Sequence, residues 1–505
     1  MSELEHAPQQ QAARLLMQLT DLRGRMDGQS AQVMVGWGQR IHRAEFMASA
    51  ENMADWLALR QNDLTGLQRP LAQLGLSSLG RMEGHVGASL QAVMAALARI
   101  SGQVGVAFPP QAAFGAGDGI LQTRRDALFG MQDTDDPQTR VMVTLPTVAG
   151  TDGGVLLAAL VDAGLDCVRI NCAHDGPEVW QGMITALKVI EARTGRQFPV
   201  TMDLGGPKFR VAETVANTAV GGVRRLFVAG DRFAMVWALK DAPQGMFAAR
   251  VSDLALVDAL VPGAVVSIDD GKLWARVERV KGACAELVVT RTKEGGAKIK
   301  PEKGFNLPGS DLRVAALTAD DLTALDFVVG HADVVSYSFV QTPADVAALI
   351  AAMRERLAPG AALPGVVLKI ETPMGLRNLP DLIIEAGGTL PVAVMIARGD
   401  LAVEIGFDRL SEIQEEILWL CEAAQVPVVW ATQVLEGMVR DGQASRAEVT
   451  DAAMSQRADC VMLNKGPHVV EAVAFLRGIL ARMDRHQTKK SPRLGTLAVW
   501  AGLQA

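Results

Sequence analysis

The chain has 505 residues, enough for about three domains or for one large barrel with additions. Its 49% hydrophobic and 21% charged residues indicate a folded protein and exclude disorder over most of the length. The 49 basic and 56 acidic residues give a formal net charge of -7, which argues against a protein that coats nucleic acid. Any anionic ligand must therefore be held by a local cluster of basic side chains.

Cysteine usage and hydropathy indicate where the protein works. The five cysteines are an odd number without a Cys-x-x-Cys pair, which favours neither a disulfide scaffold nor a zinc site. The polar N-terminal segment has no apolar export signal, and no apolar run reaches the roughly 18 residues of a spanning helix. We therefore expect a cytoplasmic protein that binds neither membranes nor nucleic acid.

The first part of the chain is predicted to be an α-helical domain over residues 1–125. Leu15, Leu16 and Leu19 recur at helical spacing, and a further helical pattern covers residues 86–100. No pattern of reactive side chains stands out here. We expect amphipathic helices that pack on the rest of the chain or on another subunit.

From about residue 140 the pattern changes to short apolar runs that alternate with helical stretches. The runs cover residues 141–146, 167–172, 199–204, 334–339, 366–371, 392–397, 426–432 and 460–464. Eight buried strands that alternate with helices form a parallel sheet and close into a TIM (β/α)8 barrel. The predicted fold class is therefore α/β.

The interval between the third and fourth strands breaks this rhythm with a β-rich, turn-rich segment. Its clearest part is a hairpin with strands at 264–268 and 273–277. A small β-barrel inserted there lies over the carboxyl face of the main barrel, where a lid belongs. The predicted domains are the helical domain over 1–125, the barrel over 126–211 and 301–485, the lid over 212–300, and a tail over 486–505.

Polar side chains collect at the carboxyl ends of the predicted strands and in the loops that follow. They are Arg169, Asn171, Asp203, Lys208, Arg210, Lys369, Glu371, Arg398, Asp400 and Thr432. Barrel enzymes assemble their sites from several strand ends, so we expect one site. Glu371 and Asp400, without a neighbouring histidine or cysteine, suit Mg²⁺ or Mn²⁺. The basic residues, Arg398 included, would gather positive charge there, which fits phosphoryl transfer from a phosphorylated carboxylate or a nucleotide.

Several runs of this sequence resemble the pyruvate kinase family. In the family's order they are Val-Arg-Ile-Asn at 168–171 with His174, Asp-Leu-Gly-Gly-Pro-Lys-Phe-Arg at 203–210, Ile-Asp-Asp-Gly at 268–271, Lys-Gly-Phe-Asn-Leu-Pro-Gly at 303–309, Ser-Phe at 338–339, Lys-Ile-Glu at 369–371, Ala-Arg-Gly-Asp-Leu at 397–401 and Ala-Thr-Gln-Val-Leu-Glu at 431–436. The resemblance covers about residues 135–480. It implies a phosphotransferase that makes pyruvate and ATP from phosphoenolpyruvate and ADP.

The resemblance also implies roles for individual residues. Glu371 and Asp400 would ligate the divalent ion, and Lys369 would stabilise the phosphoryl group in flight and the enolate. Contacts with the three-carbon substrate are implied for Arg169, Lys369, Ala397, Arg398, Gly399, Asp400 and Thr432. His174, Arg210 and Lys303 match positions that meet the nucleotide, and Thr432 would also help to route a proton to the enolate.

The sequence departs from the family at the monovalent cation site. Asn171 and Asp203 match positions that hold this cation in many members, but Ala173 replaces a serine ligand and Lys208 replaces a glutamate. A tethered lysine ammonium can supply the same positive charge. We therefore expect a lysine-type enzyme in which this site is vestigial and potassium is not required.

Two further departures leave questions open. Asn464 stands where the family usually has a serine implicated in proton delivery, so protonation of the enolate is in doubt. The family's C-terminal regulatory domain is expected to be missing, and the helical N-terminal domain is an addition. A catalytically weak metabolite sensor and a metal-dependent phosphoenolpyruvate/pyruvate lyase remain alternatives. We expect a homo-oligomer, whereas subunit number, effectors and nucleotide preference stay open.

Overall fold

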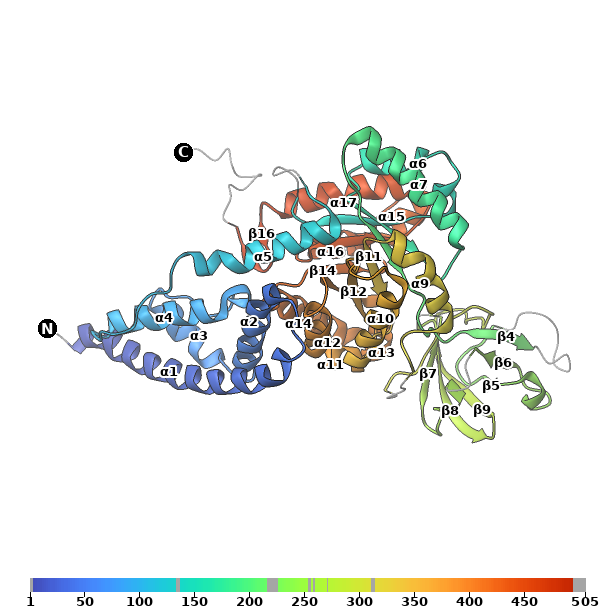
Figure 1. The fold of residues 1–505 in the computed structure, drawn as a ribbon. Helices are drawn as coiled ribbons and strands as arrows, with labels where there is room; N and C mark the ends of the chain where they lie inside the picture. Colours follow the sequence, from blue (N-terminus) through green and yellow to red (C-terminus); the bar gives the residue numbers. More distant parts are fainter. Residues whose placement is uncertain are drawn as a thin grey trace, which may run out of the picture.

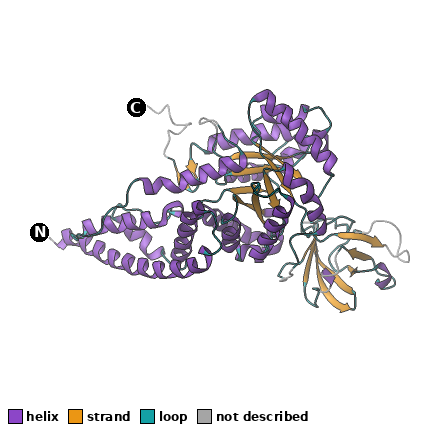
Figure 2. Cartoon of the chain, viewed as in Figure 1, coloured by secondary structure: helices purple, strands orange, loops and turns teal. Residues whose placement is uncertain are grey.

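A computed structural model describes residues 3–132, 137–215, 226–252, 256–257, 259–269, 271–309 and 314–493. Asp270, in the turn of the predicted hairpin, lies outside these residues, as does the tail beyond residue 493. Figure 1 shows a helical N-terminal part, a central barrel and a small β domain on the far side of the barrel. Helices cover the outside of the barrel, whereas strands dominate the small domain (Figure 2).

The central part is a closed barrel of eight parallel strands in the order β1-β15-β14-β13-β12-β11-β3-β2. These strands are β1 (Arg140–Thr144), β2 (Cys167–Asn171), β3 (Val200–Asp203), β11 (Val334–Tyr337), β12 (Gly365–Ile370), β13 (Val392–Ala397), β14 (Val428–Ala431) and β15 (Cys460–Leu463). Each overlaps one of the eight apolar runs in the sequence. The predicted TIM barrel is confirmed.

Helices surround the barrel, and three of those described begin at capping boxes. The helices are α6 (Val155–Asp162), α7 (Pro177–Thr194), α9 (Ala319–His331), α10 (Pro343–Arg356), α11 (Pro373–Arg377), α12 (Leu379–Gly387), α13 (Arg398–Ile405), α14 (Phe407–Ala423), α15 (Glu436–Asp441), α16 (Arg446–Ser455) and α17 (Val469–Met483). Capping boxes at Thr318, Thr342 and Ser445 fix the starts of α9, α10 and α16 by satisfying backbone N–H groups. Within the described part of the chain, no helix has both the length and the apolar character to cross a membrane.

The barrel interior changes from apolar at the amino ends of the strands to polar at the carboxyl ends. Along β2 and β12 the inward positions run from Cys167 to Arg169 and from Val367 to Lys369. The apolar end is closed by Leu128 and Phe129, which share a buried cluster with the inward side chains of the strands. The charged residues of the barrel therefore rest on an apolar floor.

That floor belongs to α5 (Ala112–Phe129), the last helix of the N-terminal part. The other helices there are α1 (Glu3–Gly38), α2 (Ala44–Arg60), α3 (Thr65–Gln73) and α4 (Val86–Ile100), with the 3-10 turn η1 (Glu83–His85). These helices pack on the barrel: Asn52 on α2 donates to the Ala423 carbonyl at 2.7 Å, and Arg124 on α5 donates to the Gln425 carbonyl at 2.9 Å. The domain boundary predicted after residue 125 falls inside α5.

A short hairpin near the C-terminus joins the N-terminal helices to the barrel. Its strands are β16 (Gln487–Thr488) and β17 (Ser491–Pro492), and Lys489 and Lys490 lie in the turn between them. Lys489 contacts Asp459 of the barrel at 2.8 Å, and Lys490 forms an ion pair with Glu83 of η1. Three segments that are distant in sequence therefore meet at the base of the barrel.

The inserted domain is a seven-stranded sheet in the order β10-β7-β8-β9-β5-β6-β4. Its strands are β4 (Val211–Val215), β5 (Arg232–Val236), β6 (Ala248–Val251), β7 (Val265–Ile268), β8 (Leu273–Lys281), β9 (Cys284–Thr292) and β10 (Phe305–Asn306). The sheet has its own hydrophobic core, and an antiparallel bridge between Arg210 and Gly304 joins the segments that precede its outer strands β4 and β10. Because the chain enters it after β3 and leaves it before β11, this domain, called the lid below, lies beside the polar end of the barrel (Figure 1).

Candidate active site

Lys369 lies at the centre of the polar end of the barrel, on the inner side of β12. Its ammonium donates to the Ser338 hydroxyl at 2.6 Å and lies 3.3 Å from Asp203 Oδ1 and 3.4 Å from Glu371 Oε1. The side chain is 12% exposed. Burial would lower the pKa of Lys369, but the charges of Asp203 and Glu371 outweigh it and raise the pKa. The strand ends thus hold a charged ammonium at the barrel mouth.

Arg169, on β2, is fixed beside Lys369 by its own partners. Its guanidinium pairs with Asp203 on the adjacent strand β3 and donates to Thr144 Oγ1 on β1 at 3.0 Å. Burial would raise the pKa of Asp203, but Arg169 and Lys369 together lower it, so this carboxylate is ionised. The predicted cluster of Arg169, Asp203 and Lys369 therefore forms one ion-paired group.

Two further carboxylates, Glu371 and Asp400, adjoin this group. Glu371 is 3% exposed, and its Oε2 accepts the backbone N–H of Phe339 at 2.6 Å. Burial raises the pKa of Glu371; Lys369 opposes this, and the negative charge of Asp400 adds to it. A cation bound between the two carboxylates would relieve that repulsion.

The donor set fits a hard divalent cation. Among the described residues no group of three or more histidine, cysteine, aspartate or glutamate side chains could hold a metal. Mg²⁺ differs from zinc in needing only one or two carboxylates, since substrate oxygens and water complete its shell. Glu371 and Asp400 therefore suit Mg²⁺ or Mn²⁺ and no thiolate-preferring metal.

The ammonium of Lys208, expected to replace the monovalent cation, pairs with Asp400. Its nitrogen lies 3.1 and 3.2 Å from the two carboxylate oxygens of Asp400. Asn171 Oδ1 instead accepts the backbone N–H of Ala173 at 3.1 Å, while Asp203 is occupied by Arg169 and Lys369. The positive charge of Lys208 therefore lies beside the Asp400 carboxylate.

The residues expected to meet the nucleotide come from both the barrel and the lid. Arg210 donates to the Glu302 carbonyl at 3.1 Å, and Lys303 lies 2.9 Å from Asp269 Oδ1. Partial burial lowers the pKa of His174, and the nearby charges of Lys465 and Arg210 lower it further. The structure therefore brings His174 and Arg210 into one positive region, to which Lys465, missed in the sequence, adds charge.

The ends of β13 and β14 meet at Thr432. Its φ of +65° lies in the left-handed region, which is strained for a β-branched residue and is found mostly where function requires it. The Thr432 hydroxyl accepts the backbone N–H of Gly399 at 2.7 Å. Arg398 pairs with Asp451 at 2.9 Å and donates to the Ala431 carbonyl. The charge expected from Arg398 at the barrel mouth is therefore neutralised by Asp451.

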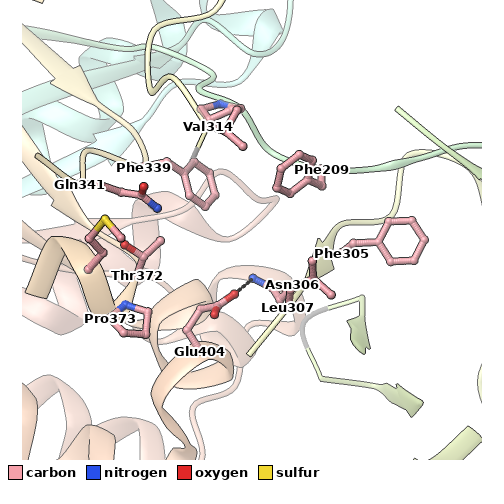
Figure 3. A pocket seen from close by; sticks show the side chains of 12 residues that line it. Phe209, Phe305, Asn306, Leu307, Val314, Phe339, Gln341, Thr372, Pro373 and Glu404 are labelled. Atoms are coloured by element: carbon pink, nitrogen blue, oxygen red, sulfur yellow. Dashed lines mark hydrogen bonds between the residues drawn. The ribbon is translucent and has the colours of Figure 1, made fainter. Parts of the chain in front are cut away.

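A cavity separates the base of the lid from the barrel (Figure 3). It has a volume of about 70 Å³ and is lined by Pro207, Phe209, Phe305, Asn306, Leu307, Val314, Phe339, Gln341, Thr372, Pro373, Met374 and Glu404. Eight of these twelve residues are apolar, but polar and apolar atoms contribute about equally to the lining surface. Glu404 is its acidic member, and its carboxyl accepts a hydrogen bond from Asn306.

Thr144, Ser338 and Glu404 were not singled out from the sequence as site residues. Thr144 ends β1, so the search for polar strand ends could have found it. Glu404 follows Asp400 by four residues, a spacing that places both on one face of α13. Ser338 carries no charge, and nothing in its spacing indicates the contact with Lys369.

Comparisons with known proteins agree with this geometry. Residues 137–472 match the family model described as pyruvate kinase, barrel domain. The pyruvate kinase of Methylorubrum extorquens is 33% identical over 69% of this chain and 69% of its own length. Those of Mycobacterium tuberculosis and Hypocrea jecorina are 30% and 31% identical, over 67% and 63% of this chain and 68% and 57% of their own lengths. The chain therefore belongs to the pyruvate kinase family.

Proposed function

We propose that this protein transfers the phosphoryl group of phosphoenolpyruvate to ADP and so produces pyruvate and ATP. The observation that carries the proposal is the charged Lys369 ammonium, buried at the barrel mouth between Asp203, Glu371 and Ser338. Phosphoryl transfer needs fixed positive charge beside the moving group far more than it needs a nucleophile on the protein. Family membership supports the same reaction.

Lys369 and Arg169 are assigned to the phosphoryl end of the substrate. Lys369 neutralises charge on the phosphoryl group during transfer and on the enolate oxygen left behind. Arg169, oriented by Asp203 and Thr144, presents its guanidinium to phosphate oxygens, for which its fork geometry is well suited. Because these groups are held before substrate arrives, little reorganisation is needed during the reaction.

Glu371 and Asp400 are the residues assigned to Mg²⁺ or Mn²⁺. When bound, the ion supplies charge neutralisation for substrate oxygens. Lys208 brings a further tethered positive charge to Asp400, and this supports a reaction that does not require potassium. The monovalent site at Asn171 and Asp203 is then vestigial.

The remaining assignments concern ADP and the proton. His174, Arg210 and Lys303 are assigned to the nucleotide, and the backbone from Ala397 to Asp400 to the three-carbon substrate. The Thr432 oxygen accepts the Gly399 N–H, so its hydroxyl hydrogen is free to point toward the substrate or a water molecule. Thr432 can thereby guide a proton to the enolate carbon.

The test is a coupled assay of pyruvate formation from phosphoenolpyruvate, ADP and Mg²⁺. Lys369→Met should lower kcat about 100- to 1,000-fold, the cost of removing one preorganised charge from a transition state. Lys188→Met, which changes a lysine with a 72% exposed side chain, is the control and should keep full activity. Mn²⁺ binding, followed by electron paramagnetic resonance, should persist in Lys369→Met. A wild-type protein without pyruvate formation, or an active Lys369→Met variant, would contradict the proposal.

Assembly and location complete the proposal. A homo-oligomer and a cytoplasmic location remain predictions made from the sequence, and light scattering of the purified protein measures the first directly. The proposed ligands are phosphoenolpyruvate or pyruvate and ADP or ATP, with no nucleic acid or membrane partner.

A further inference from the structure

Helix α13 presents two carboxylates to the two chain segments that connect the lid with the barrel. We call residues 204–210 the outgoing linker and residues 302–309 the returning linker. Asp400 and Glu404 lie four residues apart, hence on one face of α13. Asp400 contacts Lys208 of the outgoing linker, and Glu404 contacts Asn306 of the returning linker. One helix thus holds both connections.

Glu404 accepts a hydrogen bond from the returning linker. The Asn306 side-chain amide donates to Glu404 Oε1 at 3.2 Å, the bond drawn in Figure 3. Leu307, the next residue of the linker, lines the same cavity as Glu404. The carboxyl group therefore fixes the position of the linker at Asn306.

The linkers are bonded to each other and to the lid. The Val211 N–H donates to the Lys303 carbonyl at 2.8 Å, and the Phe305 N–H donates to the Phe209 carbonyl at 2.9 Å. In the returning linker, β10 also pairs with β7 of the lid sheet. A force applied to residues 306 and 307 is therefore transmitted to the whole lid.

A small cavity lies beside this point. It has a volume of about 70 Å³ and lies between Phe209 and Phe305 on the linkers and Phe339 and Thr372 on the barrel (Figure 3). Void space removes dispersion contacts that would otherwise hold the two surfaces together. The hydrogen bond from Asn306 to Glu404 is therefore a direct contact between linker and barrel at a place where packing is incomplete.

We propose that Glu404 is a positioning residue that fixes the returning linker to α13 and thereby places Lys303 over the barrel mouth. We call the contact between Asn306 and Glu404 the clamp. Lys303 precedes Asn306 by three residues, a distance of at most about 10 Å along the chain. Movement at the clamp therefore displaces the Lys303 ammonium. The inference rests on the proposed function, in which Lys303 contacts ADP. Lys369 and Glu371 lie on the barrel and are unaffected by the clamp.

The experiment compares Glu404→Leu, Glu404→Gln and the control Glu416→Leu, an exposed glutamate on α14. Hydrogen exchange of residues 302–309 is measured by mass spectrometry without ligands, and KM is measured for each substrate. Loss of the hydrogen bond between Asn306 and Glu404 should raise the KM for ADP about 5- to 20-fold in Glu404→Leu, with the KM for phosphoenolpyruvate within about 2-fold. Exchange in 302–309 should rise in parallel. Glu404→Gln keeps an acceptor oxygen and should lie near wild type, as should Glu416→Leu.

Asn306→Leu removes the other partner and should reproduce the Glu404→Leu pattern if that variant folds poorly. Unchanged exchange and an unchanged KM for ADP in Glu404→Leu would overturn the proposal. So would a Glu404→Gln protein that matches Glu404→Leu, because the charge rather than the clamp would then be responsible. The exchange measurement needs no turnover, so it stays informative even if the wild-type protein makes no pyruvate.

Discussion

Glu422 offers a direct test of the junction at the base of the barrel. It lies near the end of α14, close to Glu83 of the N-terminal helices and to Lys489 and Lys490 of the C-terminal hairpin. Burial is the main cause that raises the pKa of Glu422 to about 7; the two lysines lower it, and Glu83 raises it further. The folded protein therefore keeps the proton on Glu422 at pH values where an exposed glutamate has lost it.

The sign and size of the effect follow from this difference. Between pH 4.5 and about 7 the unfolded chain binds fewer protons at Glu422 than the folded chain does, so stability falls as the pH rises and then levels off. Raising the pKa from 4.5 to about 7, at about 1.4 kcal/mol for each tenfold change in proton affinity, corresponds to about 3 to 4 kcal/mol. Glu422→Gln has no proton to lose and should be free of this loss.

The assay is thermal unfolding of both proteins between pH 5 and pH 8, with Glu416→Gln on the same helix as the control. The two proteins share all other titrating groups, so the difference between their free energies of unfolding reports on Glu422 alone. That difference should be small at pH 5 and should grow to about 3 to 4 kcal/mol in favour of the variant at pH 8. Parallel pH profiles of the two proteins would refute the reasoning.

Two further predictions concern the site and the barrel floor. Adding KCl to a tetramethylammonium buffer should leave the wild-type rate nearly unchanged, whereas Lys208→Glu should become dependent on potassium; a several-fold activation of the wild type would contradict the assignment of Lys208. Phe129 is fully buried in the floor of the barrel. Phe129→Ala should therefore lower the free energy of unfolding, measured by urea denaturation, by about 3 to 5 kcal/mol. A decrease of only about 0.3 kcal/mol would show that the barrel does not need this side chain.

The barrel and the group around Lys369 could be predicted because they depend on strand periodicity. An apolar run fixes which residues face inward, and the last polar residue on that face, such as Lys369 or Arg169, must lie at the mouth. Lys369 lies on β12 and Glu371 lies one residue beyond its end, so the extended chain directs both side chains to the same side. The structure brings their charged groups to 3.4 Å.

The partners of long side chains could not be predicted in this way. Lys208 has a flexible four-carbon side chain, and its contact with Asp400 depends on the path of the linker that carries it. Arg398 is neutralised by Asp451, which lies 53 residues later on α16. The expectation of a helical domain over residues 1–125 likewise gave no indication that the last turn of α5 enters the barrel.

The end of α5 also decides where this protein can be divided. Leu128 and Phe129 are interior side chains of the barrel, although they arrive on a helix of the N-terminal part. A cut after residue 132 would remove these two side chains and open the apolar interior to water, and a cut after residue 125 would leave them on only the last turn of α5. Residues 101–111, between α4 and α5, are therefore the place to divide the chain if helices α1 to α4 are to be exchanged or fused to another protein. A transplant made there would leave α5 with the catalytic barrel.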